Sequence, residues 1–289
     1  MIDNGKNEVV SFVDGIVEIR MRSWGEYMDY LYKEMMNYES YIWRGHRCST
    51  WQLESTLDRM IRTSDLANTK HYDFRSKHLE QFIYASRGRR GSNPPPMVKE
   101  NDWWAIGQHH GLATPLLDWT KSPFVAAYFA FIETGKDQTT ERAIFALHRD
   151  SVENKLKELM TIESVENANY REEYEQGKHP MGLKTYWMLE REIRPQIEFI
   201  RPLSDENQRL INQGGLFTRA PDGIGLEAWV KNNFKSLEEY ILIKILVPNS
   251  DRKDCLRMLN RMNINHLTLF PDIGGASIFC NLFSEIENY

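Results

Sequence analysis

Polar residues that could bind or transform a ligand gather in one stretch of the chain, QHHGLATPLLDWTKS, residues 108–122. Histidine titrates near neutral pH and can carry a proton or bind a ligand, and a carboxylate can stabilise a developing positive charge. Side chains of consecutive helical residues point about 100° apart, so His109 and His110 are poorly placed to hold one ion. No HEXXH spacing occurs either, and we therefore expect no metal site.

Arg44 is a second candidate, because it ends an apolar strand and is followed by Gly45. A guanidinium in such a position can hold a phosphate group through two hydrogen bonds, or it can simply pair with a surface acid. Asp118 and Ser122 also have two interpretations. They lie before a helix whose N–H groups can bind an anion, and they can equally serve only to cap that helix.

The surrounding pattern predicts the elements that position these residues. VSFVDGIVEIRM predicts a strand pair, and Ser23 with Glu26 has the capping-box spacing that begins an amphipathic helix. ESYIWRGH predicts the strand that carries Arg44. NDWWAIGQHHG predicts a helix capped by Asn101 or Asp102 and ended by Gly111.

The second half of the chain continues to alternate between helices and strands. Ser122 and Pro123 begin a helix that is apolar on nearly every side and is therefore buried. ERAIFALHR, REIRPQIEFIRP and GGLFTRAP predict strands, and EEYILIKILVP predicts a central one. RKDCLRMLNRM predicts the last helix. No linker divides the chain, so we expect one α+β domain with a polar surface insertion near residues 161–180.

Composition sets outer limits on function. The chain has 289 residues, of which 41% are hydrophobic, and can bury a sizeable core; its net charge of -5 excludes a basic surface over the whole protein but not a local basic groove. The three cysteines show no CxxC spacing, and the N-terminal residues lack the pattern of a signal peptide. No apolar run reaches the ~18 residues of a membrane span. We expect a cytoplasmic protein without membrane partners.

Four stretches together resemble the FRG domain family. They are YIWRGH (41–46), WWAIGQHHGLATPLLDWTKSPFVAAYFA (103–130), NQRLINQGGLFT (207–218) and LFPDIGG (269–275). The resemblance implies an FRG domain over residues 38–289, preceded by N-terminal strands and an amphipathic helix over residues 1–37. Two positions depart from the family pattern: Trp43 stands where Phe or Tyr is usual, and Pro115 stands where Arg is common.

The order of these motifs also resembles that of the ADP-ribosyltransferases. This resemblance implies a core like theirs, with a mixed or antiparallel split sheet and flanking helices, and NAD as substrate. The implied NAD-binding residues are Arg44, Gly45, Gln108, Trp119, Thr120, Ser122 and Tyr128, with Trp119 or Tyr128 stacking on nicotinamide. The candidate catalytic residues are His109, His110, Asp118, Glu206, Asn207, Arg209 and Gln213. The Glu-x-Glu pair common in those enzymes is absent, since Asn207 and Arg209 stand there.

Proteins that combine these resemblances are similar to toxins and anti-phage effectors, one type of which modifies RNA. Arg87, Arg89 and Arg90 form a basic loop that could follow an RNA or DNA backbone, although such a loop can also be a solvated surface feature. A toxin would imply a neutralising antitoxin partner. Two alternatives remain: a non-catalytic FRG module that binds a nucleotide or a protein, favoured by the missing Glu-x-Glu pair, and a hydrolase with His109 or His110 as general base.

Overall fold

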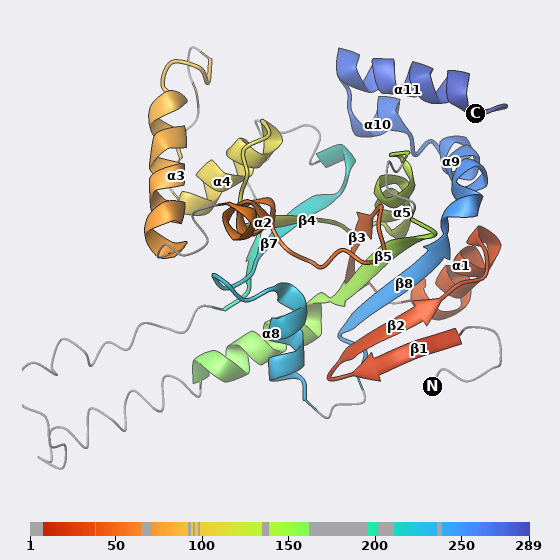
Figure 1. Cartoon of the computed structure of the whole chain (residues 1–289), viewed down its shortest axis with the longest axis horizontal. Coiled ribbons are helices and arrows are strands. Elements are labelled where there is room, and N and C mark those ends of the chain that lie inside the picture. Colours follow the sequence, from red (N-terminus) through yellow and green to blue (C-terminus); the bar gives the residue numbers. More distant parts are fainter. Residues whose placement is uncertain are drawn as a thin grey trace, which may run out of the picture.

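The sheet is the central feature of the computed structural model, which describes residues 8–37, 39–64, 71–91, 94, 96–97, 99–134, 139–161, 196–201, 211–235 and 239–289. Within these residues eight strands form one mixed sheet (Figure 1). In sheet order they are β1 (Glu8–Val13), β2 (Ile16–Arg20), β8 (Leu242–Pro248), β5 (Glu141–His148), β3 (Tyr41–His46), β4 (Leu116–Thr120), β7 (Gly215–Arg219) and β6 (Glu198–Ile200). The pair β2–β8 is parallel and the other pairs are antiparallel.

The N-terminal residues belong to this sheet. β1 and β2 form a hairpin whose turn residues, Asp14 and Gly15, have φ values of 48° and 77°, as the tight Asp-Gly hairpin turn requires. Helix α1 (Trp24–Tyr30) then begins where the Ser23 hydroxyl accepts a hydrogen bond from Glu26 N. It continues as a short π-helix, η1 (Leu31–Met35).

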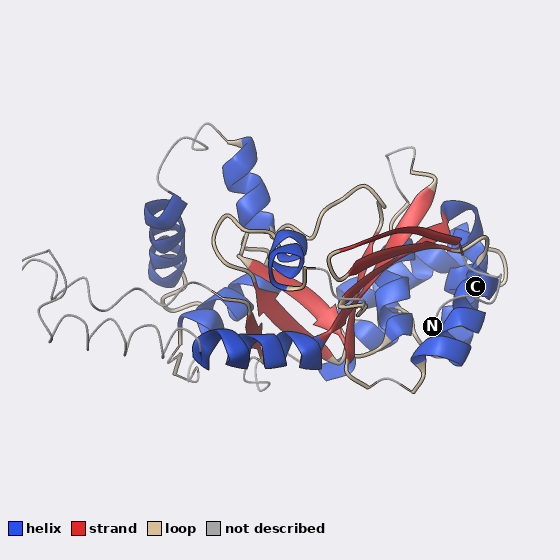
Figure 2. Cartoon of the chain, turned by 90° about the horizontal axis from the view of Figure 1, so that it is seen from below, coloured by secondary structure: helices blue, strands red, loops and turns tan. Residues whose placement is uncertain are grey.

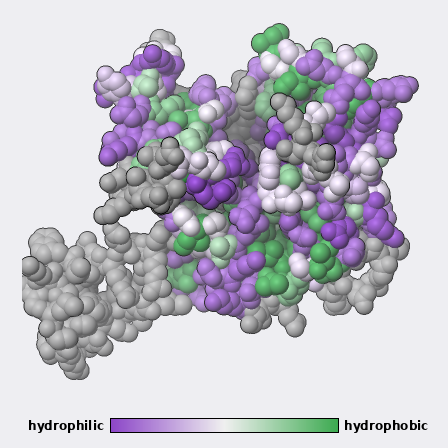
Figure 3. Space-filling view, viewed as in Figure 1, coloured by the Kyte–Doolittle hydropathy of each residue, from purple (hydrophilic) through white to green (hydrophobic). Residues whose placement is uncertain are grey.

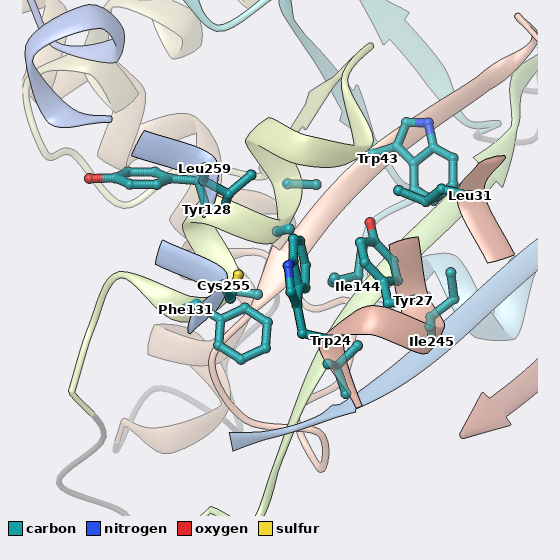
Figure 4. Close-up of a cluster of buried hydrophobic side chains, with 14 of the residues drawn as sticks. Trp24, Tyr27, Leu31, Trp43, Tyr128, Phe131, Ile144, Ile245, Cys255 and Leu259 are labelled. Carbon is teal, nitrogen blue, oxygen red and sulfur yellow. The ribbon is translucent and has the colours of Figure 1, made fainter. Parts of the chain in front are cut away.

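Two hydrophobic clusters cover the two faces of β5 and β8. Alternate residues of β5 point to opposite faces, so Ile144 belongs to one cluster and Phe145 to the other. The first cluster adds side chains from α1, α5 (Pro123–Phe131) and α9 (Arg252–Arg261), as Figure 4 shows. The second adds side chains from α8 (Leu226–Asn233) and from a helix over residues 149–161. Figure 2 shows the resulting arrangement of a sheet flanked by helices.

A third cluster lies at the other end of the sheet. There α2 (Thr56–Thr63), α3 (His71–Ala85) and α4 (Glu100–His109) contribute side chains that pack with those of β4, β6 and β7. The chain ends in α10 (His266–Leu269) and α11 (Ile273–Glu285), which follow α9. In Figure 1, α2 and α4 lie to the left of β3, α5 lies to its right, and α10 lies above α5.

Close backbone packing fixes the position of helix α5 against strand β3. A Cβ atom at Gly45 would overlap the carbonyl oxygen of Ala126 and lie 2.6 Å from Ala130 N, so only glycine fits there. Two buried arginines bind the carbonyl groups at the end of the helix. Arg142 donates to Glu133 O (3.0 Å), and Arg252 donates to Phe131 O (2.8 Å). Cations near a helix C-terminus stabilise it.

The expected α+β domain with a mixed sheet and flanking helices is confirmed. The start of α5 at Ser122 and Pro123 agrees with the structure, and the predicted strands agree with it where they are described. In REIRPQIEFIRP the strand covers Glu198–Ile200, and residues 191–195 and 202 lie outside the described residues. Two predictions were wrong. Helix α4 is capped by Lys99, not by Asn101 or Asp102, because the Asp102 carboxylate accepts from Lys99 N. RKDCLRMLNRM is not the last helix, since α10 and α11 follow it. Residues 162–180 of the expected insertion lie outside the described residues.

Candidate functional site

The junction of β3 and β4 opens into a cleft of about 430 Å3, called here the junction cleft. The two strands share one paired position, Trp43 with Thr120, so their backbones diverge beyond it. The charged and polar side chains lining the cleft are Arg44, His46, Arg47, Glu54, Thr56, Arg59, Gln108, His109, Asp118, Thr120, Glu133 and Gln213. The cleft therefore draws residues from β3, α2, α4, β4 and α5.

Arg44 spans the divergence of the two strands. Its Nη1 donates to the main-chain oxygen of Asp118 (2.7 Å) and lies 3.4 Å from Asp118 Oδ2. The Arg44 side chain is 21% exposed and that of Asp118 is 62% exposed. Burial lowers the pKa of Arg44, and the negative charge of Asp118 opposes that effect. The guanidinium is thus fixed at the floor of the cleft while one edge stays accessible.

His46 holds the other side of that guanidinium, and sequence reasoning missed it. Arg44 Nε donates to His46 Nε2 at 3.0 Å. Burial, and then the charge of Arg44, lower the pKa of His46 to about 3, so the imidazole is neutral at physiological pH and can accept this hydrogen bond. The signal was available in the sequence, because residues two apart on a strand point to the same face.

Gln108 fixes Asp118 from the opposite wall. Its Nε2 donates to Asp118 Oδ1 (2.7 Å), and its Oε1 accepts a hydrogen bond from the hydroxyl of the buried Thr114. The side-chain amide therefore has one orientation. The carboxylate of Asp118 is held by Gln108 on one oxygen and approached by Arg44 on the other.

The far end of the cleft is closed by a turn before β7 and by the segment between α10 and α11. Thr120 Oγ1 donates to Gln213 O (2.5 Å), and Gln213 Nε2 donates to Leu269 O (3.2 Å). These bonds bring Phe270 to the cleft, where its ring meets Phe129 edge to face with centroids 6.0 Å apart. The cleft thus has an aromatic side as well as a charged floor.

Several predicted NAD-binding residues have other contacts. The indole of Trp119 is 2% exposed and donates from Nε1 to Thr218 Oγ1 (2.8 Å). Tyr128 is fully buried, with its hydroxyl 2.7 Å from His266 Nδ1. Trp119 belongs to the cleft lining but its indole is nearly fully buried, and Tyr128 does not line the cleft, so neither ring is exposed for stacking on nicotinamide in this conformation. Ser122 caps α5 by accepting from Val125 N (3.3 Å), and Gly45 is explained by its contact with α5.

The predicted catalytic residues are only partly brought together. His109 lines the junction cleft, whereas His110 is exposed at the end of α4 and its ring meets that of His109 edge to face, with centroids 4.9 Å apart. Asp118 and Gln213 also line the cleft. Glu206, Asn207 and Arg209 lie outside the described residues.

The three arginines proposed for nucleic acid follow the end of α3, and none lines the junction cleft. The guanidinium of Arg87 lies 5.1 Å from the ring centroid of Tyr84, and that of Arg90 lies 5.1 Å from the ring of Trp103. Arg89 donates from Nη1 to Ala85 O (2.7 Å). Arg87 and Arg89 thus contact the last turn of α3, and Arg90 contacts a side chain of α4.

The cleft also contains residues that sequence reasoning did not single out. Arg47 forms an ion pair with Glu133, and its guanidinium lies 4.7 Å from the ring centroid of Trp51. Glu54 accepts two hydrogen bonds from Arg62, which lies outside the cleft lining. Arg59 projects from α2. Arg59 was missed because α2 was not among the predicted helices, although Ser55 and Asp58 have the capping-box spacing that begins it. Glu54 lies just before that helix.

The described residues meet neither the requirements of a metal site nor those of a membrane-spanning helix. They contain no group of three or more His, Cys, Asp or Glu side chains that could hold a metal ion. None of their helices combines the length and the apolar character needed to cross a membrane.

Comparison with known proteins identifies one part of the chain. No curated protein and no solved structure matches it. The family model described as the FRG domain matches residues 39–139. That segment contains β3, α2, α3, α4, β4 and α5, and with them Arg44, Gln108 and Asp118. The resembling stretches at 207–218 and 269–275 lie beyond the match. The chain therefore carries an FRG domain, which supplies most of the charged floor of the junction cleft.

Proposed function

We propose that the junction cleft binds NAD and that the protein transfers ADP-ribose from it to an acceptor in nucleic acid, RNA in particular, or in protein. The observation that carries the proposal is the fixed guanidinium of Arg44 beside the fixed carboxylate of Asp118. A guanidinium binds phosphate oxygens well, and NAD contains a pyrophosphate between its two ribose groups. An ADP-ribosyltransferase-like core and a role as a toxin or phage-defence effector belong to the same proposal.

The reaction requires the bond between nicotinamide N1 and ribose C1′ to break. Nicotinamide leaves with the bonding electron pair, and positive charge develops on the ribose. The carboxylate of Asp118 can stabilise that charge. A nucleophilic oxygen or nitrogen of the acceptor then bonds to C1′ and gives its proton to a base, a role for which His109 is available in the cleft lining. The paired rings of Phe129 and Phe270 offer an apolar surface for the nicotinamide ring.

The proposal is tested by incubating the purified chain with NAD labelled in its adenylate half and, separately, with RNA, DNA and protein extracts. We expect label to be transferred to one acceptor pool and free nicotinamide to appear in equal amount. The variant Arg44→Ala should lose both signals. If the wild-type chain neither binds nor consumes NAD, or if Arg44→Ala transfers label at the wild-type rate, the proposal is wrong.

A specific observation favours a second candidate, a non-catalytic nucleotide-binding or protein-binding module. Among the described residues each carboxylate that lines the cleft is already engaged: Glu54 by Arg62, Asp118 by Gln108 and Glu133 by Arg47. An engaged carboxylate is less able to act as a base or to stabilise new charge. This candidate predicts binding of a ligand without turnover, so release of nicotinamide from NAD would exclude it.

A further inference from the structure

The charges in the junction cleft are unequally paired. Arg47 is paired with Glu133, Arg44 contacts Asp118, and Glu54 is held by Arg62. Arg59 also lines the cleft, but its side chain forms no hydrogen bond or ion pair with any residue that the structure describes. It is exposed on α2, a part of the surface where hydrophilic residues gather (Figure 3). The cleft therefore contains one cation that forms no ion pair or side-chain hydrogen bond within the described residues; the carboxylate of Glu54, which Arg62 holds, interacts with Arg59 only through its charge.

The charge of Arg59 acts on the same groups that form the floor of the cleft. It lowers the pKa of Arg44, after the larger effects of burial and of Asp118, and it lowers the pKa of His46 and of Glu54. Two like charges that face the same space destabilise each other. An anion with negative charge spread over more than one group relieves this repulsion, because it can contact both guanidinium groups at once.

Arg44 retains hydrogen-bonding capacity on the side that would meet such an anion. A guanidinium has five N–H donors. Its Nε binds His46, and its Nη1 binds the main-chain oxygen of Asp118 and approaches the carboxylate. Nη2 has no partner among the residues described, so this edge of Arg44 remains open to a ligand.

Thr114 fixes the backbone at the start of α2, the helix that carries Arg59, relative to the floor of the cleft. Its carbonyl oxygen accepts from Leu57 N (3.1 Å), and its N–H donates to the hydroxyl of Thr56 (3.0 Å). These bonds attach the start of α2 to the turn before β4. The hydroxyl of Thr114 donates to Gln108, which binds Asp118. One buried residue thus connects the helix that carries Arg59 to the carboxylate that Arg44 contacts, and this fixed backbone reduces the ordering that ligand binding requires.

We propose that Arg59 is a second anion-binding residue of the junction cleft and that, together with Arg44, it holds the two phosphate groups of a pyrophosphate-containing ligand. The identification of that ligand with NAD rests on the proposed function. The binding of a pyrophosphate group does not, and it can be measured separately.

The test is calorimetric titration of the full chain with inorganic pyrophosphate, ADP-ribose and NAD at low salt. We expect Arg59→Ala to weaken the binding of all three by about 10-fold, the loss typical of a hydrogen bond to a charged group. Arg59→Lys should restore part of the affinity. Arg257→Ala is the matched control, since Arg257 is a part-exposed arginine on α9 that does not line the cleft, and it should bind as wild type does.

Each outcome decides between the two proposals. If wild type binds NAD and Arg59→Ala binds it equally well, the role of Arg59 is overturned and the proposed function stands. If pyrophosphate binds through Arg59 but NAD does not bind, the site stands and the proposed function fails. If neither binds, both fail. Thermal unfolding shows whether Arg59→Ala remains folded. If it does not, the charge-reversal variant Arg59→Glu, which keeps a long polar side chain on α2, replaces it in the titrations.

Discussion

The guanidinium of Arg44 and the main chain of Asp118 are joined by a hydrogen bond of 2.7 Å across two strands that share one paired position. A side chain thus bridges the sheet where backbone pairing ends. The same residue contacts the carboxylate of Asp118 and a neutral imidazole, that of His46. Arg44 therefore holds β3 and β4 together and also supplies positive charge to the junction cleft. Substitutions of Arg44 should affect both the stability of the fold and the binding of a ligand.

Arg44→Lys separates these two contributions. Lysine keeps the positive charge, but its ammonium group lacks the planar fork that reaches His46 and Asp118 at the same time. We expect a loss of about 1–3 kcal/mol in the free energy of unfolding and a loss of pyrophosphate affinity of about 10-fold or more. Urea unfolding and calorimetry measure the two. The control is Arg20→Lys, because Arg20 lies on β2 outside the cleft lining; it should bind pyrophosphate as wild type does. If Arg44→Lys also kept the wild-type affinity for pyrophosphate, the role of Arg44 would be contradicted.

The imidazole of His46 should make stability depend on pH in a defined direction. Its pKa is lowered to about 3 in the folded chain, against about 6.5 when unfolded. Between these values the unfolded chain binds the extra proton, so the free energy of unfolding falls as the pH is lowered through this window. His46 contributes up to about 1.4 kcal/mol per pH unit to that slope.

His46→Gln tests this assignment, because the glutamine oxygen can still accept from Arg44 while the side chain cannot titrate. Between about pH 6 and pH 5 most carboxylates contribute little, and Glu227, whose pKa burial raises, is present in both proteins. The slope of unfolding free energy against pH should therefore be smaller in the variant. His148, whose pKa burial also lowers, remains in both proteins and cancels in the comparison. Identical slopes would show that His46 does not titrate as described.

Gly45→Ala should disrupt the packing of α5 on β3. The added methyl group would overlap the carbonyl oxygen of Ala126 and crowd Ala130 N, and backbone atoms of a buried helix cannot move away cheaply. We expect a loss of about 3 kcal/mol or more in the free energy of unfolding, at the upper end of overpacking effects. Gly25→Ala is the control, since a Cβ there has Ser23 Oγ at 3.6 Å as its nearest neighbour; in helix α1 it should stabilise slightly. A Gly45→Ala protein as stable as wild type would contradict the close packing.

Local signals explain which elements could be predicted from the sequence. Ser122 with Pro123 marks the start of α5 because both its cap and its first residue are the preferred types. The run of apolar residues in β8 is a strong strand signal. Helix α11 was missed because it begins IGG, which resembles a loop. The structure shows why glycine is needed: a Cβ at Gly275 would overlap Phe270 O, a contact made only in the folded chain.

The candidate site was predictable in part, through family resemblance. Family resemblance gave Arg44, Gln108, Asp118 and Gln213, and the structure brings them to one cleft. The orientation of rings could not be obtained in this way. Trp119 follows Asp118 on β4, and neighbours on a strand point to opposite faces, so the exposure of Asp118 places the indole in the core. Arg59 lies on α2, a helix that was not predicted although Ser55 and Asp58 have the capping-box spacing of its start.

Asp118→Asn tests whether the carboxylate acts in the proposed reaction. Asparagine keeps the size of the side chain and can still accept from Gln108 through its oxygen, but it carries no charge to stabilise a positive ribose. We expect nicotinamide release to fall by about 100-fold or more, while pyrophosphate affinity stays the same or rises because a nearby negative charge is lost. Calorimetry and nicotinamide release are measured on the same preparation. Glu54→Gln removes the charge of another cleft carboxylate, one held by Arg62, and should slow release much less. If Asp118→Asn releases nicotinamide at the wild-type rate, the stabilising charge must come from elsewhere in the chain.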